Sequence, residues 1–345
     1  MKNSKEPNRS VNWKFWAGLL ISALFLFLAF KEVDVGRTWA VIRSADIFPL
    51  LLVGVIAVFQ YVIRAWRWRI LLEPIKETRF SNRFLSTLIG FAANCVLPAR
   101  LGEFLRANYL GHTEDISRSS AFGSIVVERI FDGFTLLLVL MIGLVATTFP
   151  EQLRAMAGSL RTAGLLLLLV YILIIIFLVG FKHKAEPFLH LLERLLFFLP
   201  AHLLVKIIDI VRNFSLGLVL VNTASGWTRA VFYSLLLWFT SLYQIHLVVH
   251  SFGLELPFIS TFLILAMASF GVMIPSAPGY IGTFHLAVQY GFLFYGIGKE
   301  EALSAAIMWH ASFFFPTILF GFIAFLILQS YAGTPSEETC TLEEA

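Results

Sequence analysis

Charged residues are scarce in this chain, and their scarcity argues against an ordinary water-soluble domain. Aspartate, glutamate, lysine and arginine make up 14% of the 345 residues, and 58% are hydrophobic, whereas soluble domains hold about 25% charged residues. Two cysteines, Cys95 and Cys340, are too few for a disulfide framework. The net charge of +4 comes from basic residues between apolar blocks. We interpret them as topology signals and expect no nucleic-acid partner.

Several catalytic motifs are also missing. The chain has no Walker A sequence and no HExxH motif. The first predicted outer loop contains Asp34 and Asp46 but no paired acidic motif of the kind that membrane glycosyltransferases use. We therefore expect no ATP hydrolysis, no cofactor and no metal, and we predict that the chain is not an enzyme.

Long apolar blocks are abundant, and about 20 such residues suffice to cross a bilayer. They predict an all-α polytopic membrane protein with crossing segments at 13–30, 47–63, 121–149, 164–181, 227–250 and 302–328. Two further apolar stretches, 84–110 and 258–297, are interrupted by proline and glycine. We interpret each as a broken, re-entrant helix pair, because broken backbone at membrane depth must line protein or a cavity. The protein then has roughly six transmembrane helices, or eight if both pairs cross.

The order of span, span, broken pair and span occurs twice, with Pro98 and Pro275 lying 177 residues apart. This predicts two inverted repeats within one transmembrane domain, 13–330. The halves cover about 13–149 and 164–330 and are joined through an amphipathic segment, 182–225. Residues 1–12 and the acidic tail 331–345 flank the domain.

Lysine and arginine are concentrated in the segments that this topology places inside, including Arg64, Arg67 and Arg69 beyond the second span. Because cytoplasmic loops carry an excess of these residues, we expect both termini in the cytoplasm and the chain in the cytoplasmic membrane.

The first break carries three charges, Arg100, Glu103 and Arg106, at i,i+3 spacing. One arginine could hold a phosphate or carboxylate as a fork, with Glu103 orienting it; the alternative is an internal ion-pair network that stabilises the break. Asn94 is expected to satisfy backbone groups that Pro98 frees.

The first part of the third predicted span, 121–149, carries Glu128, Arg129 and Asp132, an unusual load of charge for a membrane helix. Glu128 and Asp132 lie on one helix face. They would serve as counter-charges for Arg100 and Arg106, as a cation or proton site, or as simple helix–helix pairing. A metal site that also uses Glu103 is disfavoured, because two arginines compete for the same carboxylates.

The second break, 275–283, combines two prolines with two glycines. A helix beginning near Gly282 would direct free N–H groups toward mid-membrane, where they can bind an anion; the alternative is a kinked span. Candidate headgroup-binding residues here are Ser276, Gly279, Tyr280, Gly282, Thr283 and His285.

Three stretches together resemble the flippase-like family related to the transmembrane region of lysylphosphatidylglycerol synthase. They are Asn94…Leu97-Pro98-Ala99-Arg100-Leu101-Gly102-Glu103…Arg106, residues 126–132 and residues 275–283. The resemblance covers roughly 13–330 and implies a protein that moves lipids or lipid-linked headgroups between leaflets. Bifunctional members carry a following aminoacyltransferase domain; this chain ends at Ala345, so we expect no synthase activity.

The leading hypothesis is translocation of a phospholipid or lipid-linked anionic headgroup, with membrane lipids as the partners. The site residues would be those named in the two breaks together with Glu128, Arg129 and Asp132. The alternatives are a transferase acting on a polyprenyl-phosphate-linked substrate, and a non-transporting accessory subunit. A homo-oligomer and a separate lipid-modifying enzyme are compatible with each hypothesis.

Overall fold

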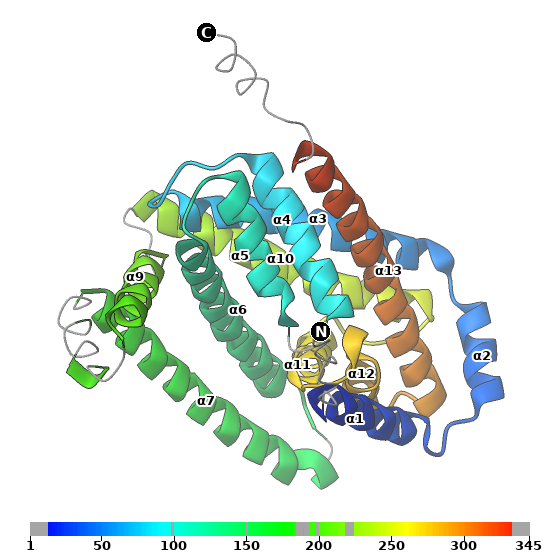
Figure 1. The fold of residues 1–345 in the computed structure, drawn as a ribbon. Helices are drawn as coiled ribbons and strands as arrows, with labels where there is room; N and C mark the ends of the chain where they lie inside the picture. The colour runs from blue at the N-terminus through cyan, green and yellow to red at the C-terminus, as the bar shows by residue number, and fades with distance from the viewer. Residues whose placement is uncertain are drawn as a thin grey trace, which may run out of the picture.

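The computed structural model describes residues 13–97, 100–149, 151–183, 189, 194–196, 200–217 and 224–332. Within these ranges the regular structure is helical and no strand occurs (Figure 1). The expected cytoplasmic segment 1–12, Pro98, parts of the amphipathic segment and nearly all of the acidic tail lie outside the described residues.

The helices follow the predicted apolar blocks along the chain. They are α1 (Trp13–Phe30), α2 (Val35–Ser44), α3 (Ile47–Leu72), α4 (Phe80–Val96), α5 (Gly102–Thr113), α6 (Arg118–Ala146), α7 (Glu151–His183), α9 (Ala201–Gly217), α10 (Ala224–Ser251), α11 (Ser260–Met273), α12 (Thr283–Leu293) and α13 (Lys299–Ala332), with the 3-10 turn η2 (Pro278–Tyr280) before α12. Four of these helices, α3, α7, α10 and α13, are long and apolar enough to cross a bilayer, while α1 and α11 contain shorter apolar segments.

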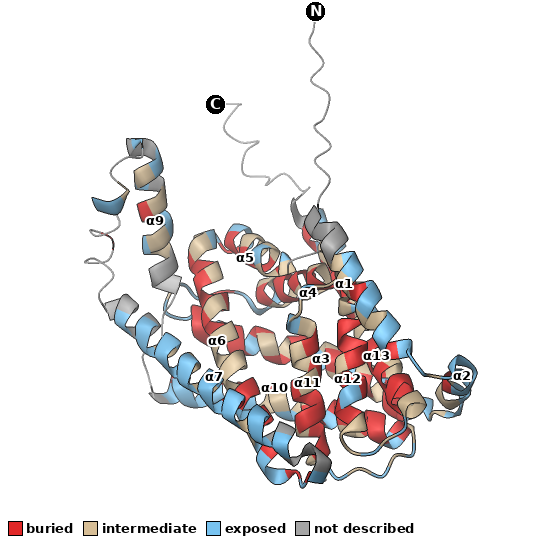
Figure 2. Cartoon of the chain, turned by 90° about the horizontal axis from the view of Figure 1, so that it is seen from below, coloured by how far each residue is buried: buried red, intermediate tan, exposed pale blue. Residues whose placement is uncertain are grey.

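The largest apolar core joins α3, α10, α11, α12 and α13, where Val53, Ile245, Ile264 and Val288 are fully buried. Helix α7 lies apart from this core and packs against α6 (Figure 1). Only 6% of its apolar stretch Gly158–Phe177 is buried, and Figure 2 shows it almost entirely exposed. An apolar helix with this much free surface fits a lipid-facing position.

The first predicted interruption is present: α4 ends at Val96 and α5 begins at Gly102, and the two helices pack together. Glycine at position 102 allows this close approach, because a Cβ there would overlap the Gly90 carbonyl oxygen. The Gly102 N–H group donates to Asn94 Oδ1 at 2.8 Å. Asn94 therefore satisfies a helix N-terminus beside the break, as the sequence predicted.

We expect Gly102→Ala to destabilise the α4–α5 hairpin by about 1–3 kcal/mol, the usual cost of overpacking. The measurement is the free energy of unfolding in mixed detergent micelles. Gly158→Ala is the matched control, since its Cβ would meet nothing within 4 Å. If Gly102→Ala and Gly158→Ala change the free energy of unfolding by the same amount, the close-packing interpretation is wrong.

The second interruption lies between α11, which ends at Met273, and α12, which begins at Thr283. Gly279 and Gly282 adopt φ values of 79° and 94°, which favour glycine. A Cβ on Gly282 would also lie 2.6 Å from the Ser22 carbonyl oxygen of α1. The turn is therefore pressed against the first helix.

Two local features were not expected from the sequence. The first predicted outer loop, between the first two spans, contains α2, whose N-terminus is capped by Asp34 accepting from the Arg37 N–H group at 3.0 Å. The second span does not end before Arg64, because α3 continues to Leu72 and buries Arg67 and Trp68. Its helical periodicity directs Arg64 and Arg67 toward charges on α6, so they are not simple interfacial residues.

Candidate functional site

Glu128 is the centre of a buried ionic cluster. Its carboxylate, on α6, is fully buried and accepts from Arg106 Nη1 and Nη2 at 3.1 and 2.9 Å. Arg129 donates to it at 2.6 Å, and Arg67 Nη2 lies 3.3 Å away. A buried carboxylate needs such partners, because an unpaired charge in an apolar interior is costly.

Asp132, one helical turn further along α6, extends the cluster. It accepts from Arg67 at 2.6 Å, and lies 3.5 Å from Arg64 and 3.3 Å from Arg129. We call the seven residues Arg64, Arg67, Glu103, Arg106, Glu128, Arg129 and Asp132 the arginine–carboxylate cluster. Four arginines and three carboxylates leave one formal positive charge in excess. Arg64 and Arg67 were not among the predicted site residues; their i,i+3 spacing at the end of an apolar span was the available signal.

Three expectations for the first break need correction. Arg100 has φ of 54° and precedes α5, so it forms no i,i+3 helical pair with Glu103. Arg106 has no exposed surface, is bound to Glu128 and lies 3.9 Å over the Trp68 ring, which makes it a packing and ion-pairing residue. Glu103 is 3.8 Å from Arg129 and orients neither predicted arginine.

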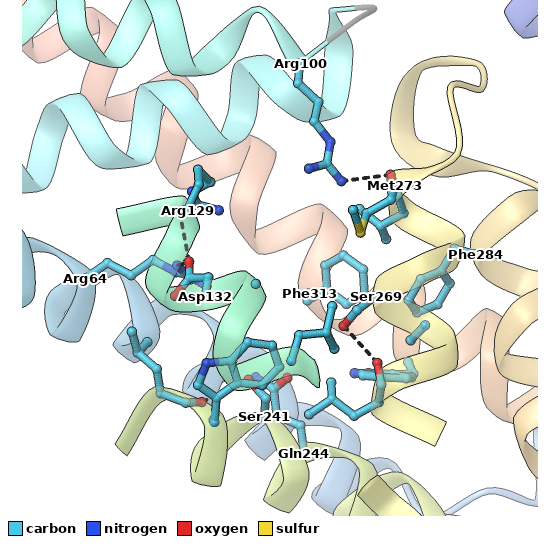
Figure 3. Close-up of a pocket in the computed structure, with 18 of the residues that line it drawn as sticks. Arg64, Arg100, Arg129, Asp132, Ser241, Gln244, Ser269, Met273, Phe284 and Phe313 are labelled. Atoms are coloured by element: carbon cyan, nitrogen blue, oxygen red, sulfur yellow. Dashed lines mark hydrogen bonds and ion pairs between the residues drawn. The ribbon is translucent and has the colours of Figure 1, made fainter. Parts of the chain in front are cut away.

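Arg100 lies where the two helix breaks meet. Its Nη2 donates to the Val272 carbonyl oxygen at 2.9 Å (Figure 3). Its guanidinium is 6.0 Å from the Tyr280 ring centroid. Among the described residues, no carboxylate oxygen lies within 4.0 Å of it. Arg100 therefore brings an uncompensated charge to a junction between α5 and α11.

A cavity of about 470 Å³ opens beside these charges. Figure 3 shows Arg64, Arg129 and Asp132 on one side, Arg100 above, and Ser241 and Gln244 at the opposite end. A smaller cavity of about 190 Å³ is lined by Asn94, Ser276 and Tyr280, and Arg100 borders both spaces. Both helix breaks thus line an interior with excess positive charge.

The N-terminus of α12 is not positioned as expected. The Gly282 N–H group donates to His285 Nδ1 at 3.3 Å, and Gly282 packs against α1. Gly279, Gly282, Thr283 and His285 line neither cavity. The His285 side chain occupies the Gly282 N–H group, and the anion site at this helix start stays a prediction.

The arrangement suits binding of an anion. Arginine presents a planar fork of donors that matches phosphate and carboxylate. The cluster carboxylates are already paired with arginines, and no group of three metal-ligating side chains occurs in the part of the chain that the structure describes.

The fold and the site together define a helical membrane protein with a positively charged internal cavity. The family model of the lysylphosphatidylglycerol synthase TM region matches residues 15–321, so the chain belongs to this family. The resemblance inferred from the sequence motifs is thereby confirmed.

Curated relatives include membrane proteins of archaea. The chain is 24% identical to the glycosyltransferase AglD of Haloferax volcanii over 95% of its own length, but it spans only 56% of that protein. It is 23% identical to the UPF0104 membrane protein MJ1595 of Methanocaldococcus jannaschii, covering 90% of this chain and 94% of the relative. It is also 23% identical to the UPF0104 membrane protein PH1989 of Pyrococcus horikoshii, with 88% and 95% covered.

Proposed function

We propose that this protein translocates a phospholipid or lipid-linked anionic headgroup between the leaflets of the cytoplasmic membrane. The observation that carries the proposal is the position of Arg100, which borders both cavities without a carboxylate partner among the described residues. A headgroup phosphate would supply that counter-charge. The acyl chains would remain in lipid while the headgroup passes through the interior.

The cluster supports entry and release of the headgroup. Arg64 and Arg129 also border the larger cavity, so they attract an anion, while Asp132 competes for the same arginines. A site with this competition binds weakly enough to release its ligand. Arg106 and Glu128 lie behind these residues and hold α5 against α6.

The proposal includes the topology predicted from sequence: six to eight spans, two inverted repeats and both termini in the cytoplasm. In support, the two broken pairs, α4–α5 and α11–α12, each pack as a hairpin and meet at the Arg100–Val272 hydrogen bond. A homo-oligomer and a separate lipid-modifying enzyme remain proposed partners.

The test is lipid exchange by purified protein in liposomes. Fluorescent lipids are placed in both leaflets, and the fraction accessible to a membrane-impermeant quencher is followed in time. We expect anionic phosphodiester lipids to become accessible at least several-fold faster than in protein-free liposomes, with no new lipid product by mass spectrometry. Exchange no faster than in protein-free liposomes would contradict translocation.

A transferase acting on a polyprenyl-phosphate-linked substrate is the second candidate. It is favoured by the similarity to a protein named as a glycosyltransferase, although the chain spans only part of that relative. The same arginines would bind the phosphate, but Asp132 is held by three arginines and is a poor general base. A new glycolipid formed with a sugar donor in the same liposomes would favour this candidate.

A further inference from the structure

We infer that α2 is an interfacial helix, which lies along the bilayer surface and inserts Val35 and Trp39 into the boundary between lipid headgroups and acyl chains. The inference does not depend on the proposed function, because α2 lines neither of the two cavities described above. It adds an interaction surface to the protein. The partner of this surface is the phospholipid leaflet on the side of the membrane where α3 begins.

The chain itself holds α2 close to the membrane. Two residues, Ala45 and Asp46, separate α2 from α3, which is long and apolar enough to cross a bilayer. Because an extended residue spans at most about 3.6 Å, the end of α2 lies within roughly 11 Å of the first residue of α3. The Asp46 N–H group also donates to the Ser251 carbonyl oxygen of α10 at 2.8 Å, which fixes this corner. Helix α2 is therefore at the level of the headgroups.

Contacts with α13 decide which face of α2 turns away from the protein. The two helices pack together, and the Ser304 hydroxyl group donates to the Thr38 carbonyl oxygen at 3.1 Å, where Thr38 is buried. Val35 and Trp39 are four residues apart and so share one face of the helix. They are 63% and 54% exposed, which shows that no neighbouring helix covers them. Figures 1 and 2 show α2 at the edge of the molecule.

The exposed apolar surface continues along the chain into α3. Ile47, Phe48 and Leu51, in the first two turns of α3, are each more than half exposed. Exposed apolar side chains on a membrane-crossing helix contact lipid, so Val35 and Trp39 extend a lipid-facing surface beyond the end of this helix. Tryptophan is enriched at membrane interfaces, because its amphipathic ring sits at the level of the headgroups. A bilayer is therefore the partner that fits this surface.

The experiment measures the quenching of a thiol-reactive fluorescent dye on the full chain in liposomes. The background is Cys340→Ser, since Cys95 is buried. The dye is attached in turn at Trp39→Cys and at Val35→Cys, and the second variant keeps the tryptophan. We expect lipids with a nitroxide near the headgroup to quench both dyes roughly twofold or more above a water-facing control. That control is Glu77→Cys, whose parent side chain is 86% exposed in the segment between α3 and α4.

Val55→Cys is the lipid-facing reference, since Val55 is exposed and lies about 12 Å along α3 from its first residue. A nitroxide deep in the acyl chain should quench it more than it quenches the two dyes on α2. The inference is overturned if aqueous iodide quenches both α2 dyes as strongly as the dye at Glu77→Cys. It is also overturned if neither quencher reaches them, because protein would then cover α2. Failure of the proposed function is distinguishable, since these measurements require no lipid exchange.

Discussion

Glu128→Gln is expected to lose on the order of 3–5 kcal/mol of folding stability, the usual cost of removing one partner from a buried ion pair. Glu128 has no exposed surface and contacts Arg67, Arg106 and Arg129. Its neutralisation would leave Arg106, also without exposed surface, next to a group that no longer balances its charge. The measurement is the free energy of unfolding in mixed detergent micelles, followed by tryptophan fluorescence.

Glu103→Gln provides the matched control for this variant. Its side chain is 16% exposed and its contact with Arg129 is 3.8 Å long, so we expect a loss below about 1 kcal/mol. The double variant Arg106→Gln with Glu128→Gln should recover part of the lost stability, because it removes the stranded charge together with its partner. Equal stability of Glu128→Gln and Glu103→Gln would show that the cluster does not hold α5 to α6.

Arg100→Gln is expected to slow exchange of anionic lipids in liposomes by roughly 10- to 100-fold, since a hydrogen bond to a charged group contributes about 1.5–3 kcal/mol. The change removes the charge that borders both cavities and keeps a side chain able to donate to Val272. The folding stability should change little, because Arg100 is only half-buried and no described carboxylate depends on it.

The control is Arg43→Gln, the same substitution at an exposed arginine on α2 that lines neither cavity. Figure 1 shows α2 at the edge of the molecule. It should exchange anionic lipids at the wild-type rate. Arg100→Gln should also reduce the salt dependence of exchange, since electrostatic attraction is screened by ions. Unchanged exchange by a folded Arg100→Gln protein would remove the physical basis of headgroup binding at the two breaks.

The sequence alone predicted the structural features that depend on neighbouring residues in the chain. Apolar blocks predicted the long helices, and proline and glycine predicted the interruptions at 96–102 and 273–283. The motifs around Arg100, Glu128 and Gly279 indicated the family, which the family model confirmed. The sequence also indicated the residue types of the ionic cluster, because Glu128 and Asp132 are too costly for a helix that faces only lipid.

Tertiary structure decided which of these charges meet. The sequence indicated Arg64 and Arg67 only as topology signals beyond the second span, whereas the continuation of α3 directs them toward Asp132. Arg106 and Arg100 are six residues apart, yet one is buried against Glu128 and the other borders the cavities, because α5 begins between them. The pairing of charges depends on how helices pack across long sequence separations, and a single sequence carries no direct record of that packing.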